Sequence, residues 1–210
     1  DPGHRAAVVA DRVVLDPQDA AWLERWRSAT WEPPRGGFTQ RHVADAVLAS
    51  LGQGDDLMFG SSSIIRAADV SPIRDDAPRT YANRGLAGID GTIATATGLA
   101  LANGRPMTVL LGDLTAQHDL GALVRPPSEP WPQRLRVVVV DDQGGSIFRK
   151  LEQGAPEYAH AFDRVFLTPQ GADLAAVATA LGWRSVTVSD ATALDAALAS
   201  DAEFILARVS

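Results

Sequence analysis

Two aspartates, Asp113 and Asp142, each follow a run of apolar residues that is typical of a buried strand. The run before Asp113 is MTVLLG (107–112), and the run before Asp142 is VVVVD (137–141). If the two strands are neighbours, both carboxylates stand at one edge of a sheet and repel each other unless a cation lies between them. Gly144 can turn its backbone carbonyl inward as a third oxygen ligand, and Mg²⁺ prefers oxygen ligands that it shares with phosphate. The pattern predicts a magnesium site; the alternative is that one aspartate caps a helix and the other occupies a turn.

The two aspartates belong to an alternation of apolar runs with helical patterns, which is typical of an α/β fold. The expected strands are 56–60, 79–83, 107–113, 134–142, 185–189 and 203–209. The expected helices are 38–52, 88–103, 118–124, 173–182 and 190–200. Strands that are apolar on both faces indicate a parallel sheet that is covered on both sides. We therefore predict a doubly wound, mainly parallel sheet with helices on both faces.

The ends of the helices and of the domain carry local signals of their own. Thr39 and Asp173 are suitable N-caps, and Gly52 and Gly182 are expected to end their helices. The stretch EPPRGG (32–37) contains two prolines and two glycines, which indicates a linker. We place the domain boundary there, with residues 1–34 before it and the α/β domain at 35–210.

Glycine and polar residues gather just after the expected strands. In doubly wound sheets, ligands bind beyond the carboxyl ends of the strands. The segments at those ends are GSSSIIR (60–66), NRGLAGIDG (83–91), GDL (112–114) and DDQGG (141–145). The P-loop pattern and the dinucleotide pattern G-x-G-x-x-G after a strand are both absent from the sequence, so phosphate binding here requires a different device.

Composition excludes several classes of function. The 210 residues carry a formal net charge of -7 with no cluster of Lys and Arg, which argues against nucleic-acid binding. The sequence has no cysteine, so disulfides and thiolate chemistry are excluded. No apolar run approaches the roughly 20 residues of a membrane span, and no signal peptide is visible, so we expect a cytoplasmic protein.

The motifs after the strands resemble those of thiamine diphosphate-dependent enzymes. GDL, followed about thirty residues later by DDQGG, resembles their cofactor motif, which usually begins Gly-Asp-Gly and ends Asn-Asn. Within that superfamily, GSSSIIR, YANRGLAGIDGT, GDLTAQHDLGAL and DDQGGSIFRKLEQG are similar to the SEPHCHC synthases of menaquinone biosynthesis. The similarity runs nearly without gaps from residue 36 to 167. It implies that residues 1–34 are the tail of a preceding central domain with its linker.

The resemblance implies a cofactor site with three groups of residues. The ligands of Mg²⁺, with Mn²⁺ as the alternative metal, are Asp113, Asp142 and the carbonyl of Gly144. The diphosphate of thiamine diphosphate is lined by Gly112, Leu114 and Gly145. Ile89 corresponds to the bulky residue beneath the cofactor that forces its V-shaped conformation.

The resemblance also implies the reaction and a substrate pocket. SEPHCHC synthases decarboxylate 2-oxoglutarate and add the succinyl group to isochorismate. Arg66 and Arg84 match the arginines that bind substrate carboxylates, for which a planar guanidinium is suited. Ser62 adds a hydroxyl at the same end, and the apolar wall is formed by Ile147, Phe148 and Leu151. His118 also matches the family pattern, but we assign it no chemistry.

The sequence departs from the family at several positions. The family commonly has Asn where this chain has Asp141 and Gln143, and often at Asp142, so we expect tighter Mg²⁺ binding. Ser61 stands where Asn is usual. No candidate is found for the pyrimidine-side domain with its activating glutamate. We therefore expect a C-terminal fragment without turnover by itself, whose partners are the N-terminal and central domains of the same polypeptide in a homo-oligomer.

Three alternatives remain open from the sequence. The first is the small subunit of a split thiamine diphosphate-dependent 2-oxoacid decarboxylase, such as sulfopyruvate decarboxylase. The second is a non-catalytic binding module on a flavodoxin-like fold. The third is another member of the superfamily, such as an acetolactate-synthase-like enzyme.

Overall fold

A computed structural model describes residues 19–29, 37–72, 74–83 and 88–210. The chain divides into two units, residues 1–36 and 37–210. In the first unit the described part is helix α1 (Asp19–Ser28), on which the rings of Trp22 and Trp26 have centroids 5.6 Å apart. The predicted domain boundary lies outside the described residues. None of the described helices is long and apolar enough to cross a membrane.

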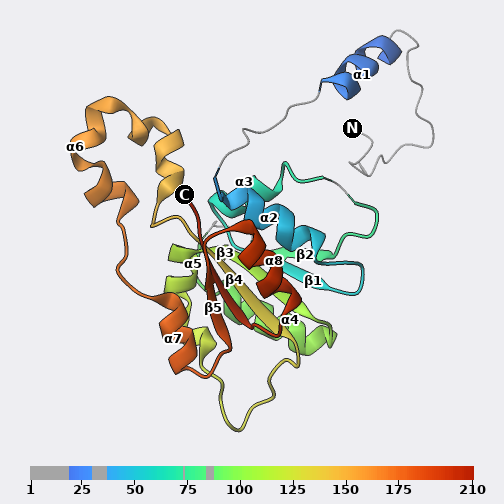
Figure 1. Cartoon of the computed structure of the whole chain (residues 1–210), viewed down its shortest axis with the longest axis vertical. Helices are drawn as coiled ribbons and strands as arrows, with labels where there is room; N and C mark the ends of the chain where they lie inside the picture. The colour runs from blue at the N-terminus through green and yellow to red at the C-terminus, as the bar shows by residue number, and fades with distance from the viewer. Residues whose placement is uncertain (1–18, 30–36, 73, 84–87) are drawn as a thin grey trace. The chain divides into compact units, whose positions relative to one another are not determined.

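The second unit is built on a six-stranded sheet (Figure 1). Its strands are β1 (Asp56–Phe59), β2 (Arg79–Ala82), β3 (Met107–Gly112), β4 (Leu135–Asp141), β5 (Ser185–Val188) and β6 (Phe204–Arg208). The order is β2-β1-β3-β4-β6-β5, and every pair is parallel, which confirms the predicted sheet. Strands β3 and β4 are direct neighbours, with Gly112 opposite Val140. The two strands that precede Asp113 and Asp142 therefore end side by side.

Helices cover both faces of the sheet, as predicted (Figure 1). One face carries α2 (Gln40–Ala49), α3 (Ser63–Ala68) and α8 (Ala191–Ala199), and the other carries α4 (Thr92–Asn103), α5 (Asp113–His118) and α7 (Leu174–Ala180). A hydrophobic core lies on each face of the sheet. Because successive side chains of a strand point to opposite faces, β4 contributes side chains to both cores. Val138 and Val140 pack on the α2 side, and Val137 and Val139 pack on the α4 side. The continuous valine run is explained by burial on both faces.

The N-caps of α2 and α7 are the residues that the sequence predicted, but the end of α2 differs from the prediction. The Thr39 side chain accepts a hydrogen bond from the backbone N–H of His42, and Asp173 caps α7 in the same way. Helix α2 ends at Ala49 with Ser50 as its C-cap, so the prediction that Gly52 ends it was wrong. The chain turns two residues earlier because Leu51 packs into the core. The backbone N–H of Gly52 instead donates to the Asp55 side chain at 2.9 Å.

Short helices account for most of what the sequence did not reveal. Helices α3 and α5 are only six residues long, too short for a periodic pattern to stand out. The helix expected at 118–124 is a 3₁₀ turn, η1 (Leu120–Leu123). The segment after β4 forms η2 (Ser146–Lys150), η3 (Glu152–Gly154), η4 (Pro156–Tyr158), α6 (Ala159–Phe162) and the π-helical turn η5 (Asp163–Leu167).

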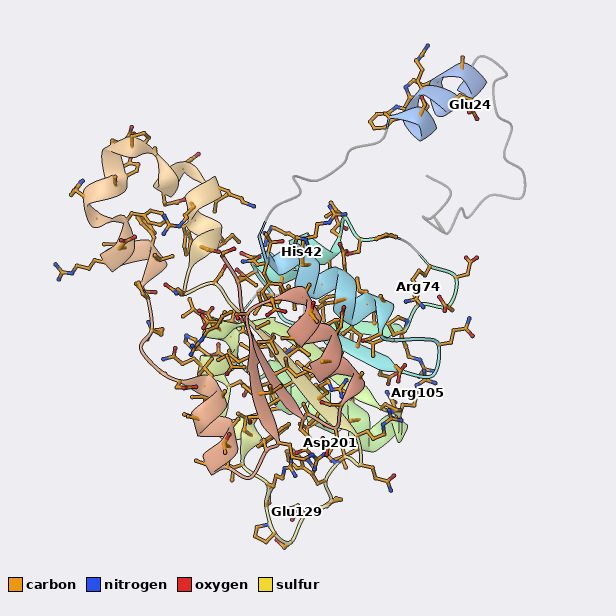
Figure 2. All side chains as sticks on the ribbon, viewed as in Figure 1. Glu24, His42, Arg74, Arg105, Glu129 and Asp201 are labelled. Carbon is orange, nitrogen blue, oxygen red and sulfur yellow. The ribbon has the colours of Figure 1, made fainter. Side chains whose placement is uncertain are left out.

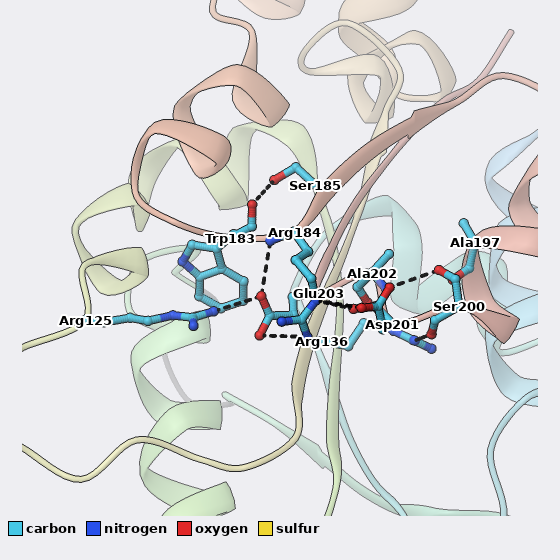
Figure 3. Close-up of polar contacts among 10 residues, drawn as sticks. All are labelled: Arg125, Arg136, Trp183, Arg184, Ser185, Ala197, Ser200, Asp201, Ala202 and Glu203. Atoms are coloured by element: carbon cyan, nitrogen blue, oxygen red, sulfur yellow. Dashed lines mark hydrogen bonds and ion pairs between the residues drawn. The ribbon is translucent and has the colours of Figure 1, made fainter.

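Polar residues at the amino-terminal end of the strands satisfy one another (Figure 3). Arg136 donates hydrogen bonds of 2.7–2.9 Å to three backbone carbonyls of the turn 198–202. Glu203 lies between Arg125 and Arg184, at 3.1 and 3.3 Å. These side chains are engaged within the fold by ion pairs and backbone carbonyls.

The buried carboxylate of Asp56 is likewise structural. It opens β1, is fully buried, and pairs with Arg105 at 2.8 Å. The amide of Asn103 donates to its second oxygen at 2.7 Å. Figure 2 shows Arg105 and Asp201 toward this end of the sheet, whereas His42 lies on the first turn of α2 near the other end. Both oxygens of this buried carboxylate are engaged within the fold, and loss of either partner would leave the charge of Asp56 uncompensated.

Gly60 should tolerate no side chain, because a Cβ there would lie 2.6 Å from the Cβ of Leu111 on β3. We expect Gly60→Ala to lower the free energy of unfolding by about 1–3 kcal/mol through overpacking. Gly98→Ala is the control, because Gly98 lies within α4 and a Cβ added there would meet no atom within 4 Å. That change should raise stability by up to about 1 kcal/mol. If urea unfolding gave the same change in free energy for Gly60→Ala and Gly98→Ala, the close approach of β1 to β3 at Gly60 would be contradicted.

Candidate functional site

The functional site is a pocket at the carboxyl ends of β1, β3 and β4. Neighbouring strands β1 and β3 are followed by helices on opposite faces, α3 and α5, so a crevice opens between the two connections. The pocket is lined by Gln40, Ser61, Ser62, Ser63, Ile64, Ile89, Gly112, Asp113, Leu114, Thr115, Val140, Asp142, Gly144, Gly145, Ile147 and Phe148. All four predicted strand-end segments contribute to it, and the segment 83–91 does so through Ile89.

Most predicted site residues come together in this pocket. Those that line it are Ser62, Ile89, Gly112, Asp113, Leu114, Asp142, Gly144, Gly145, Ile147 and Phe148. Arg66 does not line it; this exposed residue of α3 donates from Nη1 to the carbonyl of Ser62 at 2.7 Å. Leu151 is 52% exposed and also lies outside the lining. Arg84 lies outside the described residues. The chemical roles assigned to all of these residues remain predictions.

The backbone around the pocket adopts unfavourable conformations. In the described part of the chain, three residues other than glycine have positive φ: Ser62 (85°), Gln143 (64°) and Thr168 (44°). Ser62 lines the pocket, and Gln143 stands between two lining residues, Asp142 and Gly144. Such conformations cost on the order of 1–3 kcal/mol each and gather at ligand sites, where they place groups that an unstrained chain would not.

Asp113 is held nearly out of water at the start of α5. It is 8% exposed, and its carboxylate accepts a hydrogen bond of 2.8 Å from the backbone N–H of Leu114. Burial, followed by the negative charge of Asp142, raises the pKa of Asp113 to about 7. The charged form of this side chain is therefore disfavoured until a positive charge arrives.

Asp142 is the second carboxylate of the pocket, and it is held by two side chains. Its Oδ2 accepts hydrogen bonds from Gln40 Nε2 and from the Ser146 hydroxyl. Burial raises the pKa of Asp142, and the hydrogen bonds from Ser146 and Gln40 oppose that rise. Asp113 and Asp142 thus share one pocket in which both are costly to ionise, which favours binding of a cation between them.

The donor set fits a hard cation that also contacts phosphate. Among the described residues there is no group of three or more His, Cys, Asp or Glu side chains able to hold a metal. A cation here would bind two carboxylates and take its other oxygens from the backbone and a ligand. Mg²⁺ commonly binds in this way, through one or two carboxylates together with phosphate oxygens.

The two glycines after Asp142 are required by close packing. Gly144 has φ of 119°, and a Cβ on it would lie 2.1 Å from the carbonyl oxygen of Leu167. The backbone N–H of Gly145 donates to that same oxygen at 2.7 Å. The loop is therefore fixed against η5 with bare backbone facing the pocket, which suits close approach of an anionic ligand.

An apolar wall closes the other side of the pocket. Ile89, Ile147 and Phe148 contribute to it, and the Phe148 ring lies 5.5 Å from the ring of Phe166, centroid to centroid. An apolar wall beside two carboxylates excludes water, and this strengthens the electrostatic interactions made within the pocket.

Two residues that sequence reasoning did not assign to the site contact the start of α4 and Asp90, the residue after Ile89. The Asp119 carboxylate accepts hydrogen bonds from the backbone N–H groups of Ile93 (2.6 Å) and Ala94 (3.0 Å), and so caps α4. The N-cap residue of α4 is a glycine with no side chain to do this. His118 pairs with Asp90 at 3.2 Å. The His-Asp dipeptide in TAQHDL was visible, but its partners lie 25–28 residues away and carry no local signal.

Gln40 is the third residue that the sequence did not single out. It lies at the first position of α2, in the pocket lining, and contacts Asp142 across 102 residues of chain. A glutamine at a helix start carries no distinguishing pattern, so only the fold reveals the contact.

Comparison with known proteins agrees with this geometry. Residues 60–204 match the family model described as the thiamine pyrophosphate enzyme C-terminal TPP-binding domain. A Nocardioides sp. protein named 2-succinyl-5-enolpyruvyl-6-hydroxy-3-cyclohexene-1-carboxylate synthase is 46% identical over 88% of this chain and 37% of its own length. Proteins of the same name from Rhodococcus opacus and Paenarthrobacter aurescens are 42% and 44% identical, over 85% and 86% of this chain. The chain spans about a third of the length of these relatives.

Loss of the Asp119 cap should loosen α4 at the pocket. We expect Asp119→Ala to lower the free energy of unfolding by about 1–2 kcal/mol and to speed amide hydrogen exchange at Ile93 and Ala94. Asp190→Ala is the control, because it removes the local cap of α8, where Asp190 accepts from Ala193 at 2.8 Å. The control should lose similar stability without faster exchange at Ile93. Unchanged exchange in Asp119→Ala would contradict the assignment.

The raised pKa of Asp113 predicts a pH-dependent stability in the presence of a chelator. The folded chain keeps the proton up to pH about 7, whereas the unfolded chain releases it near 3.8. The free energy of unfolding should therefore fall as pH rises between these values, by about 4 kcal/mol at most. Asp113→Asn should remove this fall and be the more stable protein at pH 8, while Asp195→Asn on the exposed side of α8 should behave as wild type. If the free energy of unfolding changed with pH in the same way for Asp113→Asn and for wild type, the prediction would be refuted.

Proposed function

The chain belongs to the thiamine pyrophosphate enzymes, whose C-terminal TPP-binding domain it contains, and from this we propose that its pocket binds the diphosphate of thiamine diphosphate through Mg²⁺. The observation that carries the proposal is the pair of carboxylates, Asp113 and Asp142, in one pocket at the crevice of the sheet. Their mutual repulsion is relieved by a divalent cation, and a diphosphate supplies the remaining oxygen ligands.

Each loop of the pocket has a defined task in this proposal. Asp113 and Asp142 hold Mg²⁺, with Mn²⁺ as a substitute, and the Gly144 carbonyl adds a backbone oxygen. Gly112, Leu114 and Gly145 border the diphosphate, where bare backbone allows close approach. The burial that raises the pKa of Asp113 also strengthens its attraction to the cation once the carboxylate is charged.

The apolar side of the pocket positions and shields the reacting part of the cofactor. When bound, thiamine diphosphate supplies the electron sink that allows carbon–carbon bonds next to a carbonyl to be broken and formed. Ile89, which lies just before the capped start of α4, would support the cofactor from below. Ile147 and Phe148 keep water from the reacting atoms.

We propose further that the whole protein is a SEPHCHC synthase, which decarboxylates 2-oxoglutarate and adds the succinyl group to isochorismate. The proposal is supported by the relatives at 42–46% identity that carry this name. Both substrates carry carboxylates, which Arg66 and Arg84 would bind. Arg66 itself does not line the pocket, but its guanidinium donates to the carbonyl of Ser62, a lining residue. The Ser62 hydroxyl adds a donor there, and Leu151 would join the apolar wall.

The remaining parts of the synthase belong to the same proposal. We infer that the pocket is completed by other domains of the polypeptide and that the intact protein is a homo-oligomer. The exposed Leu151, together with the partly apolar segment 146–167, suits burial against such a neighbour.

The direct test is isothermal titration of thiamine diphosphate into the chain, with Mg²⁺ and with chelator. We expect binding that requires Mg²⁺ and that Asp113→Ala weakens at least about tenfold, because a ligand of the cation is lost. Asp195→Ala, an exposed aspartate of α8, should bind as wild type does. Binding that is equal with and without Mg²⁺, or equal in Asp113→Ala, would favour a metal-free binding module.

A further inference from the structure

Gln40 connects helix α2 to the carboxylate pair through a single amide group. Its Nε2 donates to Oδ2 of Asp142 and lies 3.4 Å from the Ser146 hydroxyl oxygen. The Ser146 hydroxyl donates to the same Oδ2. The start of α2 and the loop that joins β4 to η2, which lie 102 residues apart in the chain, thus converge on one carboxylate oxygen.

Because both donors bind Oδ2, the two oxygens of Asp142 have different roles. Within the described part of the chain, no other side chain donates to this carboxylate. With Oδ2 occupied, Oδ1 is the oxygen left for a cation. Mg²⁺ requires near-ideal octahedral geometry, so a carboxylate that binds through one oriented oxygen suits it better than one free to rotate.

The other carboxylate is positioned differently. Asp113 follows directly on β3, and its carboxylate interacts with the backbone of Leu114, its own neighbour, and with the backbone of Gly144. Its orientation is therefore set by backbone groups. Asp142 depends on two side chains: Ser146 belongs to the same loop, and Gln40 comes from another layer of the fold. Substitution of Gln40 can change the pocket without altering either carboxylate.

We propose that Gln40 is a positioning residue of the cation site, whose amide orients Asp142 so that one carboxylate oxygen meets the cation. The inference rests on the proposed function, because it concerns the same site. It implies that residues 40 and 142 form a matched donor and acceptor. An amide at 40 requires an acceptor at 142, and exchange of the two chemical groups preserves the bond: Glu at position 40 would accept from an Asn at 142, whose oxygen would still face the cation.

The test is a set of substitutions at the two positions, read out as Mn²⁺ affinity in the presence of thiamine diphosphate, by electron paramagnetic resonance of free Mn²⁺. We expect Gln40→Met, which keeps the length but loses the donor, to weaken Mn²⁺ binding about tenfold or more. Gln40→Glu should also weaken it, because two carboxylates then face each other. Asp142→Asn added to Gln40→Glu should recover most of the lost affinity. Gln53→Met is the control, because that exposed side chain only donates to the Asp75 carbonyl at 3.2 Å.

The outcomes separate the inference from the function on which it rests. No Mn²⁺ binding by wild type would overturn the proposed function and, with it, this inference. Binding by wild type that Gln40→Met leaves unchanged would overturn the inference alone. A loss in Gln40→Glu that Asp142→Asn fails to relieve would also overturn it, because a role in packing alone does not depend on which group stands at position 142. Thermal unfolding with chelator verifies that each variant is folded.

Discussion

The repulsion between two shielded carboxylates is the constraint on which the site depends. Asp113 and Asp142 end neighbouring parallel strands, so the sheet itself brings them to one pocket. Burial and the charge of Asp142 raise the pKa of Asp113 to about 7, so ionised Asp113 destabilises the folded chain when no cation is bound. A divalent cation removes that cost and at the same time attracts phosphate. Destabilisation without ligand and affinity for ligand therefore have one physical origin.

The two ends of the sheet illustrate how the fold directs ligands to one of them. At the amino-terminal end, buried charges such as Asp56 and Arg136 are satisfied by ion pairs or backbone carbonyls. At the carboxyl end, Ser62 and Gln143 adopt strained backbone conformations, and the carboxylates lack a cationic side-chain partner among the described residues that line the pocket. The carboxylates without a cationic partner thus lie at the carboxyl end, where ligands bind in a doubly wound sheet.

Local sequence patterns predicted the features that local physics determines. The valine run of β4 indicated burial on both faces, Thr39 indicated the start of α2, and the aspartates after β3 and β4 indicated a shared edge. These patterns could not predict contacts between residues that are far apart in the chain. Helix α2 ends at Ala49, with Ser50 as its C-cap, because Leu51 packs into the core. Gln40 contacts Asp142 across 102 residues of chain, and no periodic pattern indicates that contact. The short helices after β4 depend on packing of loop against loop and were missed for the same reason.

The most direct test of the account is anomalous diffraction at the manganese edge, from crystals of the chain grown with Mn²⁺ and thiamine diphosphate. The account predicts one strong peak bound by Asp113 and by a single oxygen of Asp142, with diphosphate oxygens completing the coordination at about 2.0–2.2 Å. Gln40 should remain hydrogen-bonded to the other oxygen of Asp142. A bound diphosphate without a metal peak between the two carboxylates, or a peak elsewhere in the protein, would contradict it.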